Sequence, residues 1–146
     1  MKILLAIDDS PCSKRVIEAV GRRHWPAGTE MRILSVIEDP ECAGEEECAA
    51  AAEKHGRSAA NRCKRACQDL KEKCKEADIG YLVIGGGAAA QIIYSAQEWR
   101  ADKVIIGAHG RTVCPHNFTG SVSRAVKESL GSMVEVIADA EPLALV

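Results

Sequence analysis

The sequence has few aromatic residues and no long apolar run, and both absences narrow its possible functions. Phe, Trp and Tyr make up 3% of the 146 residues, whereas a surface that stacks nucleic-acid bases needs several aromatic side chains. The formal net charge is −2, so no basic excess attracts a phosphate backbone or an anionic membrane. No apolar run approaches the length of a membrane span. We therefore expect no nucleic-acid partner and no membrane partner.

Several sequence motifs are also missing. The seven cysteines include no Cys-x-x-Cys pair, and the apolar start at residues 1–7 is too short for an export signal before Asp8 and Asp9 interrupt it. These features predict a cytoplasmic protein whose cysteines are thiols. The chain lacks the Gly-x-x-x-x-Gly-Lys-Ser/Thr pattern, and no Gly-x-Gly-x-x-Gly follows its first apolar run, which disfavours a P-loop and a dinucleotide-binding fold.

Apolar strands alternate with amphipathic helices along the chain. Ser10 is predicted to be a helix N-cap, with Pro11 at the first helical position. Repeated strand–helix units of this length imply an α/β fold, with a parallel sheet covered by helices on both faces. We expect one domain over residues 1–146. The predicted strands are 3–7, 30–37, 80–84, 103–106 and 133–138. The predicted helices are one from Pro11 to about Trp25, one over 48–77, a short one after the third strand with Ala89, Ile92, Ile93 and Ala96 on one side, and one over 120–130.

Glycine and serine residues gather after the fourth predicted strand. Gly107 and Gly110 follow that strand, and Gly120 opens the next helix. Glycine lets a backbone approach a ligand closely, and the free N–H groups of a helix N-terminus favour an anion. Ser121 and Ser123 add hydroxyl donors in the first helical turn. Any one of these glycines taken alone is more readily a simple turn or helix cap, but all of them at this spacing after an apolar strand favour a phosphate-binding segment.

The Gly-x2-Gly-x9-Gly-Ser spacing over residues 107–121 resembles the nucleotide motif of the universal stress protein family. The opening ILLAIDDS resembles the family's first strand, with its acidic residue at Asp8. Residues 101–107 and 120–126 resemble the strand and the helix that flank the motif. The resemblance covers essentially the whole chain. It implies a five-stranded parallel sheet with strand order 3-2-1-4-5.

The resemblance also implies a ligand and partners. The ligand would be ATP, with Mg²⁺ as an option, or another adenine nucleotide. The partners would be a second copy of the chain, as a homodimer, and unidentified client proteins. The resemblance implies a site with three parts. The adenine would be framed by the backbone of Ala6, Ile7 and Val36, and the ribose would meet Asp8. The ribose and phosphates would lie along Gly107, Ala108, His109 and Gly110, and the outer phosphates would be held by Gly120, Ser121, Val122 and Ser123.

Two of these residues have alternatives that the sequence leaves open. Asp8 can cap the helix that follows Ser10, and both roles can coexist. His109 either touches a phosphate or faces solvent. Two departures from the family pattern also stand out: the loop at residues 113–117 is more polar than usual, and Glu135 occupies a position that is usually apolar in the last strand. In the family that strand often pairs across a dimer, so Glu135 leaves the dimer mode open.

Catalysis has little support in the sequence. No Ser/His/Asp order or paired-carboxylate spacing stands out, so we expect a binding and regulatory module that hydrolyses ATP slowly at most. One alternative is a slow Mg-dependent ATPase or phosphotransferase. Another is a thiol redox sensor that uses Cys114 and the helix cysteines.

The helix cysteines have a simpler interpretation. Cys63, Cys67 and Cys74 share one helix face with Leu70. Cysteine behaves as a small hydrophobe in a core, so we expect a core stripe in preference to a metal or redox site. Cys114 and His116, on either side of a proline, are a weak metal-site candidate because no further ligands lie nearby in the sequence.

Overall fold

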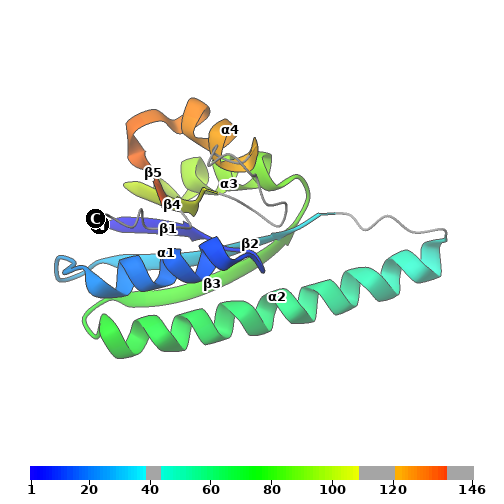
Figure 1. Cartoon of the computed structure of the whole chain (residues 1–146), viewed down its shortest axis with the longest axis horizontal. Helices are drawn as coiled ribbons and strands as arrows, with labels where there is room; N and C mark the ends of the chain where they lie inside the picture. The colour runs from blue at the N-terminus through cyan, green and yellow to red at the C-terminus, as the bar shows by residue number, and fades with distance from the viewer. Residues whose placement is uncertain (39–43, 109–120, 138–146) are drawn as a thin grey trace, which may run out of the picture.

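The computed structural model describes residues 1–38, 44–108 and 121–137. Its strands form one parallel sheet in the order β3-β2-β1-β4-β5 (Figure 1), so the predicted sheet and strand order are confirmed. The strands are β1 (Lys2–Ala6), β2 (Glu30–Ile37), β3 (Asp78–Gly85), β4 (Lys103–Gly107) and β5 (Val134–Ile137).

Helices cover both faces of this sheet, as predicted. The cluster on one face contains residues of α1 and α2, and the cluster on the other contains residues of α3 and α4. The described helices are α1 (Pro11–Arg22), α2 (Glu45–Lys73), α3 (Ala88–Trp99), α4 (Ser121–Leu130) and the short 3-10 helix η1 (Gly131–Met133).

The central strand β1 shows why the sheet is buried on both sides. Ile3 and Leu5 pack into the α1/α2 cluster, whereas Leu4 and Ala6 pack into the α3/α4 cluster. Successive side chains of a strand point to opposite faces, so a continuous apolar run fits a strand that is covered twice. Burying each large aliphatic side chain stabilises the fold by roughly 1.5–3 kcal/mol.

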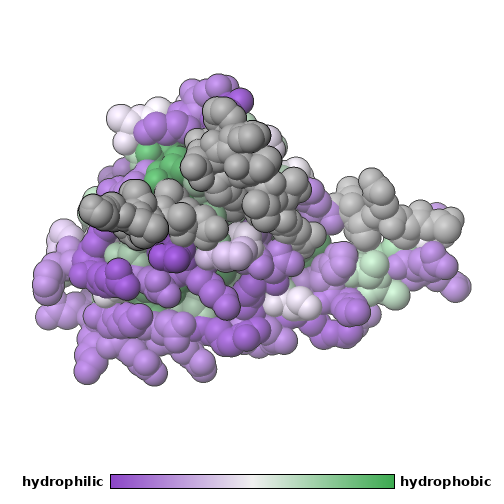
Figure 2. Space-filling view, in the orientation of Figure 1, coloured by the Kyte–Doolittle hydropathy of each residue, from purple (hydrophilic) through white to green (hydrophobic). Residues whose placement is uncertain are grey.

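Helix α2 differs most from its predicted bounds. It begins at Glu45, three residues before the predicted start, so Glu45–Glu47 form its first turn and not a connector. Carboxylates are favourable there because they face the positive end of the helix dipole. The helix ends at Lys73, four residues before the predicted end. Its first turns extend beyond the sheet in Figure 1, and the outer surface of α2 is largely hydrophilic in Figure 2.

The cysteines of α2 belong to the core. Cys63 and Cys67 lie in the α1/α2 cluster with Leu70, which confirms the predicted core stripe. Cys74 is buried in the same cluster but is the C-cap residue, so the prediction that it lies within the helix is wrong. Cys48 is disulfide-bonded, so the expectation that every cysteine is a thiol is wrong at this position.

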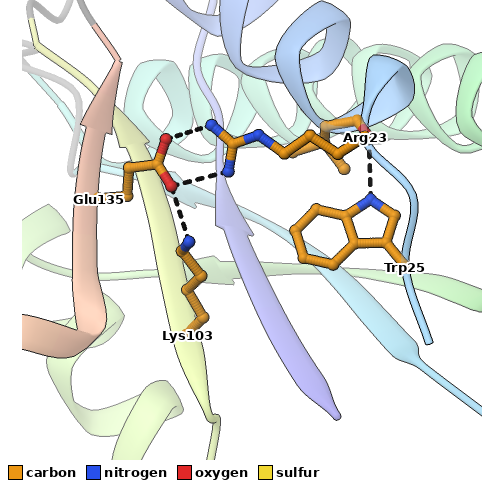
Figure 3. A network of polar contacts seen from close by, with 5 residues as sticks. Arg23, Trp25, Lys103 and Glu135 are labelled. Carbon is orange, nitrogen blue, oxygen red and sulfur yellow. Dashed lines mark hydrogen bonds and ion pairs between the residues drawn. The ribbon is translucent and has the colours of Figure 1, made fainter.

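An ion-pair network joins α1, β4 and β5 on the α1/α2 side of the sheet (Figure 3). The Glu135 carboxylate accepts hydrogen bonds from both terminal nitrogens of Arg23, and the Arg23 Nη1–Oε1 distance is 2.7 Å. Lys103 Nζ lies 2.8 Å from the same Oε1. Glu135 therefore replaces the expected apolar residue with a carboxylate that two cations neutralise.

No helix in the described ranges is long and apolar enough to cross a membrane.

Candidate functional site at the carboxyl ends of β1, β2 and β4

The candidate site lies where the sheet changes winding direction. The chain passes from β1 to β2 on one side and later returns to β4 on the other side of β1. In open parallel sheets, ligands bind outside the carboxyl ends of the strands at such a point. Ala6 pairs with Leu34 of β2 and with Ile106 of β4, so the ends of these three strands are adjacent.

The end of β1 leaves backbone groups of β2 without a strand partner. The β1–β2 register stops at Ala6 and Leu34, and the last bond runs from Ile7 N–H to the Leu34 carbonyl at 2.9 Å. Backbone groups alternate sides along a strand, so the N–H and C=O of Val36 point the same way as the Leu34 carbonyl. They face the space beyond the end of β1, where a planar ring with a donor and an acceptor on one edge can bind.

Asp8 comes just after the end of β1 and is hydrogen-bonded to residues at the start of α1. Its Oδ1 accepts hydrogen bonds from the Ser10 backbone N–H at 2.8 Å and from Ser13 Oγ at 2.9 Å. Its own backbone N–H donates to Ser13 Oγ at 2.7 Å. The expected capping role of Asp8 is therefore confirmed. Oδ2 makes no hydrogen bond in the described part of the chain, which leaves one carboxylate oxygen for a ligand.

Gly107 brings β4 close to the first turn of α1. A Cβ at Gly107 would lie 2.6 Å from Cys12 Cβ, closer than van der Waals contact allows, so glycine is required here by packing. The next residue, Ala108, donates its N–H to the Ile137 carbonyl at 2.8 Å. Its own carbonyl accepts from Ser123 Oγ at 3.1 Å. These contacts place the start of α4 beside the end of β4.

The first turn of α4 is graded from exposed to buried. Ser121 is exposed, Val122 is half-buried and Ser123 is 2% exposed. The N–H groups of a first helical turn have no partner within the helix and carry the positive end of its dipole. They suit an anion that approaches from the carboxyl end of β4.

The structure therefore brings part of the predicted site together. Asp8 follows β1, Gly107 ends the adjacent strand β4, and Ala108 comes next and is bonded to the start of α4 through Ser123. The predicted residues His109, Gly110 and Gly120, and also Cys114 and His116, lie outside the described residues. The predicted residues within the described ranges are Ala6, Ile7, Asp8, Val36, Gly107, Ala108, Ser121, Val122 and Ser123.

Sequence reasoning missed two contributors, Cys12 and Ser13. The Asp8-x-Ser10-x-x-Ser13 spacing was the available signal, since a serine at the third helical position can reach back to a residue before the N-cap. Cys12 offered no such signal, because its contact with Gly107 joins residues far apart in the chain.

The described residues also bear on the two alternative chemistries, metal binding and thiol redox. Among the residues that the structure describes, no group of three His, Cys, Asp or Glu side chains could hold a metal ion. Burial raises the pKa of the Cys63 thiol to about 11 and also raises the pKa of Cys67 and Cys74. Because the thiolate is the reactive form, these thiols are poor redox groups.

Comparison with known proteins supports the same fold. The model of the universal stress protein family matches residues 1–137, and a search of curated proteins finds no match. Hypothetical protein MJ0577 is 23% identical, with a TM-score of 0.86 over 97% of this chain and 96% of that one. Universal stress protein UspA from Lactobacillus plantarum is 18% identical, with a TM-score of 0.78 over 94% and 97%.

A third similar structure contains a ligand. The universal stress protein family protein from Arabidopsis thaliana, solved with AMP bound, is 14% identical to this chain. Its TM-score is 0.58, and the match covers 99% of this chain and 96% of that one. At these identities the likeness shows a shared fold.

Proposed function

Because the chain belongs to the universal stress protein family, we propose that it binds ATP at the carboxyl ends of β1, β2 and β4 as a nucleotide-responsive regulatory module. The observation that carries the proposal is the meeting of Asp8, the Gly107–Ala108 segment and the start of α4 at one point of the sheet. Proteins of this fold have been solved with cAMP, AMP and dAMP, which supports an adenine nucleotide as the ligand class.

The described residues fit the three parts of such a ligand. The Val36 N–H and C=O match the donor and acceptor edge of adenine. Asp8 Oδ2 can accept from the ribose hydroxyls. The start of α4 at Ser121 suits the outer phosphates, with Ser123 holding it against Ala108. His109, Gly110 and Gly120 complete the proposed phosphate segment. Mg²⁺, when present, would neutralise charge on the phosphates.

The proposed role is binding without efficient turnover. The described part of the site offers one carboxylate, Asp8, with one oxygen already engaged by Ser10 and Ser13. Phosphoryl transfer is accelerated chiefly by positioning and by cations at the transferred group. A slow Mg-dependent ATPase remains the second candidate, and measuring turnover in the same samples distinguishes the two.

Calorimetry with ATP on the purified full-length chain tests the proposal. We expect wild-type protein to bind ATP at millimolar concentration or below, and Gly110→Val to lose that binding. Gly80→Val is the matched control, because a Cβ at Gly80 has no heavy atom within 4 Å. Absence of ATP binding by the wild type contradicts the proposal, and so does unchanged binding by Gly110→Val.

We also propose that the regulatory unit is a homodimer formed along β3. This edge strand pairs with β2 alone within the described chain, and Tyr81 and Leu82 are 41% and 40% exposed. β3 contains no lysine, arginine or proline, the residues that protect an edge from pairing. Its one charge, Asp78, lies at one end, so antiparallel pairing of two copies keeps the two carboxylates apart.

A further inference from the structure

The serine at position 13 is in contact with the proposed ribose ligand Asp8 at two points. Ser13 Oγ accepts from the Asp8 backbone N–H at 2.7 Å and donates to Asp8 Oδ1 at 2.9 Å. Ser13 is 8% exposed, so water competes little for its hydroxyl. Its backbone N–H donates to the Ser10 carbonyl at 3.1 Å, which fixes the residue within the first turn of α1.

These contacts determine which oxygen of Asp8 is available. Oδ1 accepts from two donors, the Ser10 N–H and the Ser13 hydroxyl. The carboxylate therefore cannot rotate about its Cβ–Cγ bond without losing both hydrogen bonds. Oδ2 remains without a hydrogen bond in the described chain. The arrangement fixes one oxygen for structure and leaves the other for a ligand.

We propose that Ser13 is a positioning residue that orients Asp8 toward the ribose hydroxyls of the nucleotide. The inference rests on the proposed function and adds to it a residue that does not itself touch the ligand. Without the Ser13 hydroxyl, Oδ1 keeps only the Ser10 donor, and the Asp8 N–H loses its acceptor. The carboxylate then samples rotamers that are less favourable for the sugar.

The dependence of binding on the ribose hydroxyls separates positioning from general stability. Binding of ATP and of 2′,3′-dideoxy-ATP is measured calorimetrically on wild type and Ser13→Ala, after thermal unfolding confirms that both are folded. We expect Ser13→Ala to weaken ATP binding by about tenfold, the effect of roughly one hydrogen bond. Binding of the dideoxy analogue should change by less than about twofold, because it has no hydroxyl for Asp8 to accept from.

Two further variants complete the test. Ser13→Thr keeps the hydroxyl and should restore ATP binding. In the Asp8→Ala background, adding Ser13→Ala should cause no further loss, because the two residues act through one contact. Ser95→Ala, a buried serine on α3, is the control for losing a buried hydroxyl elsewhere.

The outcomes distinguish this inference from the proposed function. Equal loss of both nucleotides in Ser13→Ala, or no loss of either, overturns the positioning role while nucleotide binding stands. An additive effect in the Asp8→Ala background also overturns it. Failure of the wild type to bind ATP overturns the proposed function, and the role of Ser13 falls with it.

Discussion

Arg23 and Glu135 form a two-point ion pair across 112 positions of sequence (Figure 3). Arg23 is the C-cap residue of α1, and Glu135 lies in β5. Lys103 adds a second cation to the same carboxylate. The contact joins the beginning of the chain to the last described strand, and β5 also carries Ile137, whose carbonyl holds Ala108. The network therefore supports the strand that fixes one side of the candidate site.

Glu135→Gln should destabilise the protein by about 1–2 kcal/mol, because it leaves Arg23 and Lys103 half-buried without their carboxylate. Chemical denaturation at neutral pH measures the free energy of unfolding. Glu53→Gln is the matched control, since the Glu53–Arg57 pair is 71% and 68% exposed and should contribute well under about 1 kcal/mol. Equal effects of the two substitutions would contradict the role of the network.

The same carboxylate should make stability depend on acid pH. The hydrogen bond from Arg23 lowers the pKa of Glu135 most strongly. Burial of the carboxyl group acts in the opposite direction, but the hydrogen bond from Lys103 adds to that of Arg23, so the pKa falls from 4.5 to about 2. A lowered folded-state pKa means that its contribution is fully present above the unfolded value and is lost as the pH falls from about 4.5 toward 2. The stability difference between wild type and Glu135→Gln should therefore shrink between pH 6 and pH 3 by denaturation. A difference that is constant over this window would contradict the assignment.

Gly107→Ala should destabilise the fold by about 1–3 kcal/mol, the usual cost of an overpacked contact. The added Cβ would meet Cys12 Cβ at 2.6 Å, and Cys12 is fixed in the first turn of α1. Thermal unfolding measures the loss. Cys12→Gly in the Gly107→Ala background should restore part of the stability, since it removes the atom in conflict. No rescue would mean that Gly107 is required for another reason.

The strands were predictable because their chemistry is local. β1 and β4 are continuous apolar runs, and a parallel sheet buried on both faces requires such runs. Helix ends were harder to predict. Glu45–Glu47 looked like an acidic connector, yet acidic residues are also what a helix N-terminus favours. The contacts of Glu135 with Arg23, and of Gly107 with Cys12, depend on tertiary structure, and nothing near these residues in the sequence predicts them.

The candidate site shows the same division. The Gly-x2-Gly-x9-Gly-Ser spacing predicts a phosphate-binding segment without help from the fold, because the whole motif lies in one stretch of chain. The role proposed for Val36 depends on where β1 ends beside it, which only the register of the sheet reveals. Ser13 is an intermediate case. Its spacing from Asp8 can be seen in the sequence, but its two hydrogen bonds with Asp8 can be seen only in the structure.

Cys63 and Cys67 should resist alkylation in the folded protein. Both thiols are buried, and burial raises their pKa, to about 11 for Cys63. The thiolate fraction at pH 8 is therefore small and is shielded from reagent. Iodoacetamide labelling followed by peptide mass spectrometry should find neither residue modified in native protein and both modified in guanidinium chloride. Rapid native labelling of either would revive the redox-sensor alternative.

Pairing of two copies along β3 should be visible as a site-specific cross-link. Antiparallel pairing centred on Tyr81 places the two Tyr81 Cα atoms about 4.5–5.5 Å apart, within the range of about 4.4–6.8 Å that a disulfide spans. Tyr81→Cys should therefore form a covalent dimer under mild oxidation. Trypsin cuts after Lys75 and Arg100, and the peptide 76–100 contains no native cysteine. Recovery of two copies of this peptide joined by a disulfide shows that position 81 of one copy lies beside position 81 of the other. Disulfides formed by the native cysteines do not affect this result, because they lie in other peptides.

The reversible dimer should respond to charge on the same strand. Leu82→Lys places an ammonium group within the proposed interface, and sedimentation should show association weakened by at least about tenfold. Ser132→Lys adds the same charge at an exposed position in η1, beside β5, and should leave association unchanged. ATP binding by Leu82→Lys should be retained, because Leu82 lies on the far edge of the sheet from β4. If Ser132→Lys dissociates the dimer and Leu82→Lys does not, the two copies pair through β5, and the exposed side chains of β3 serve another purpose.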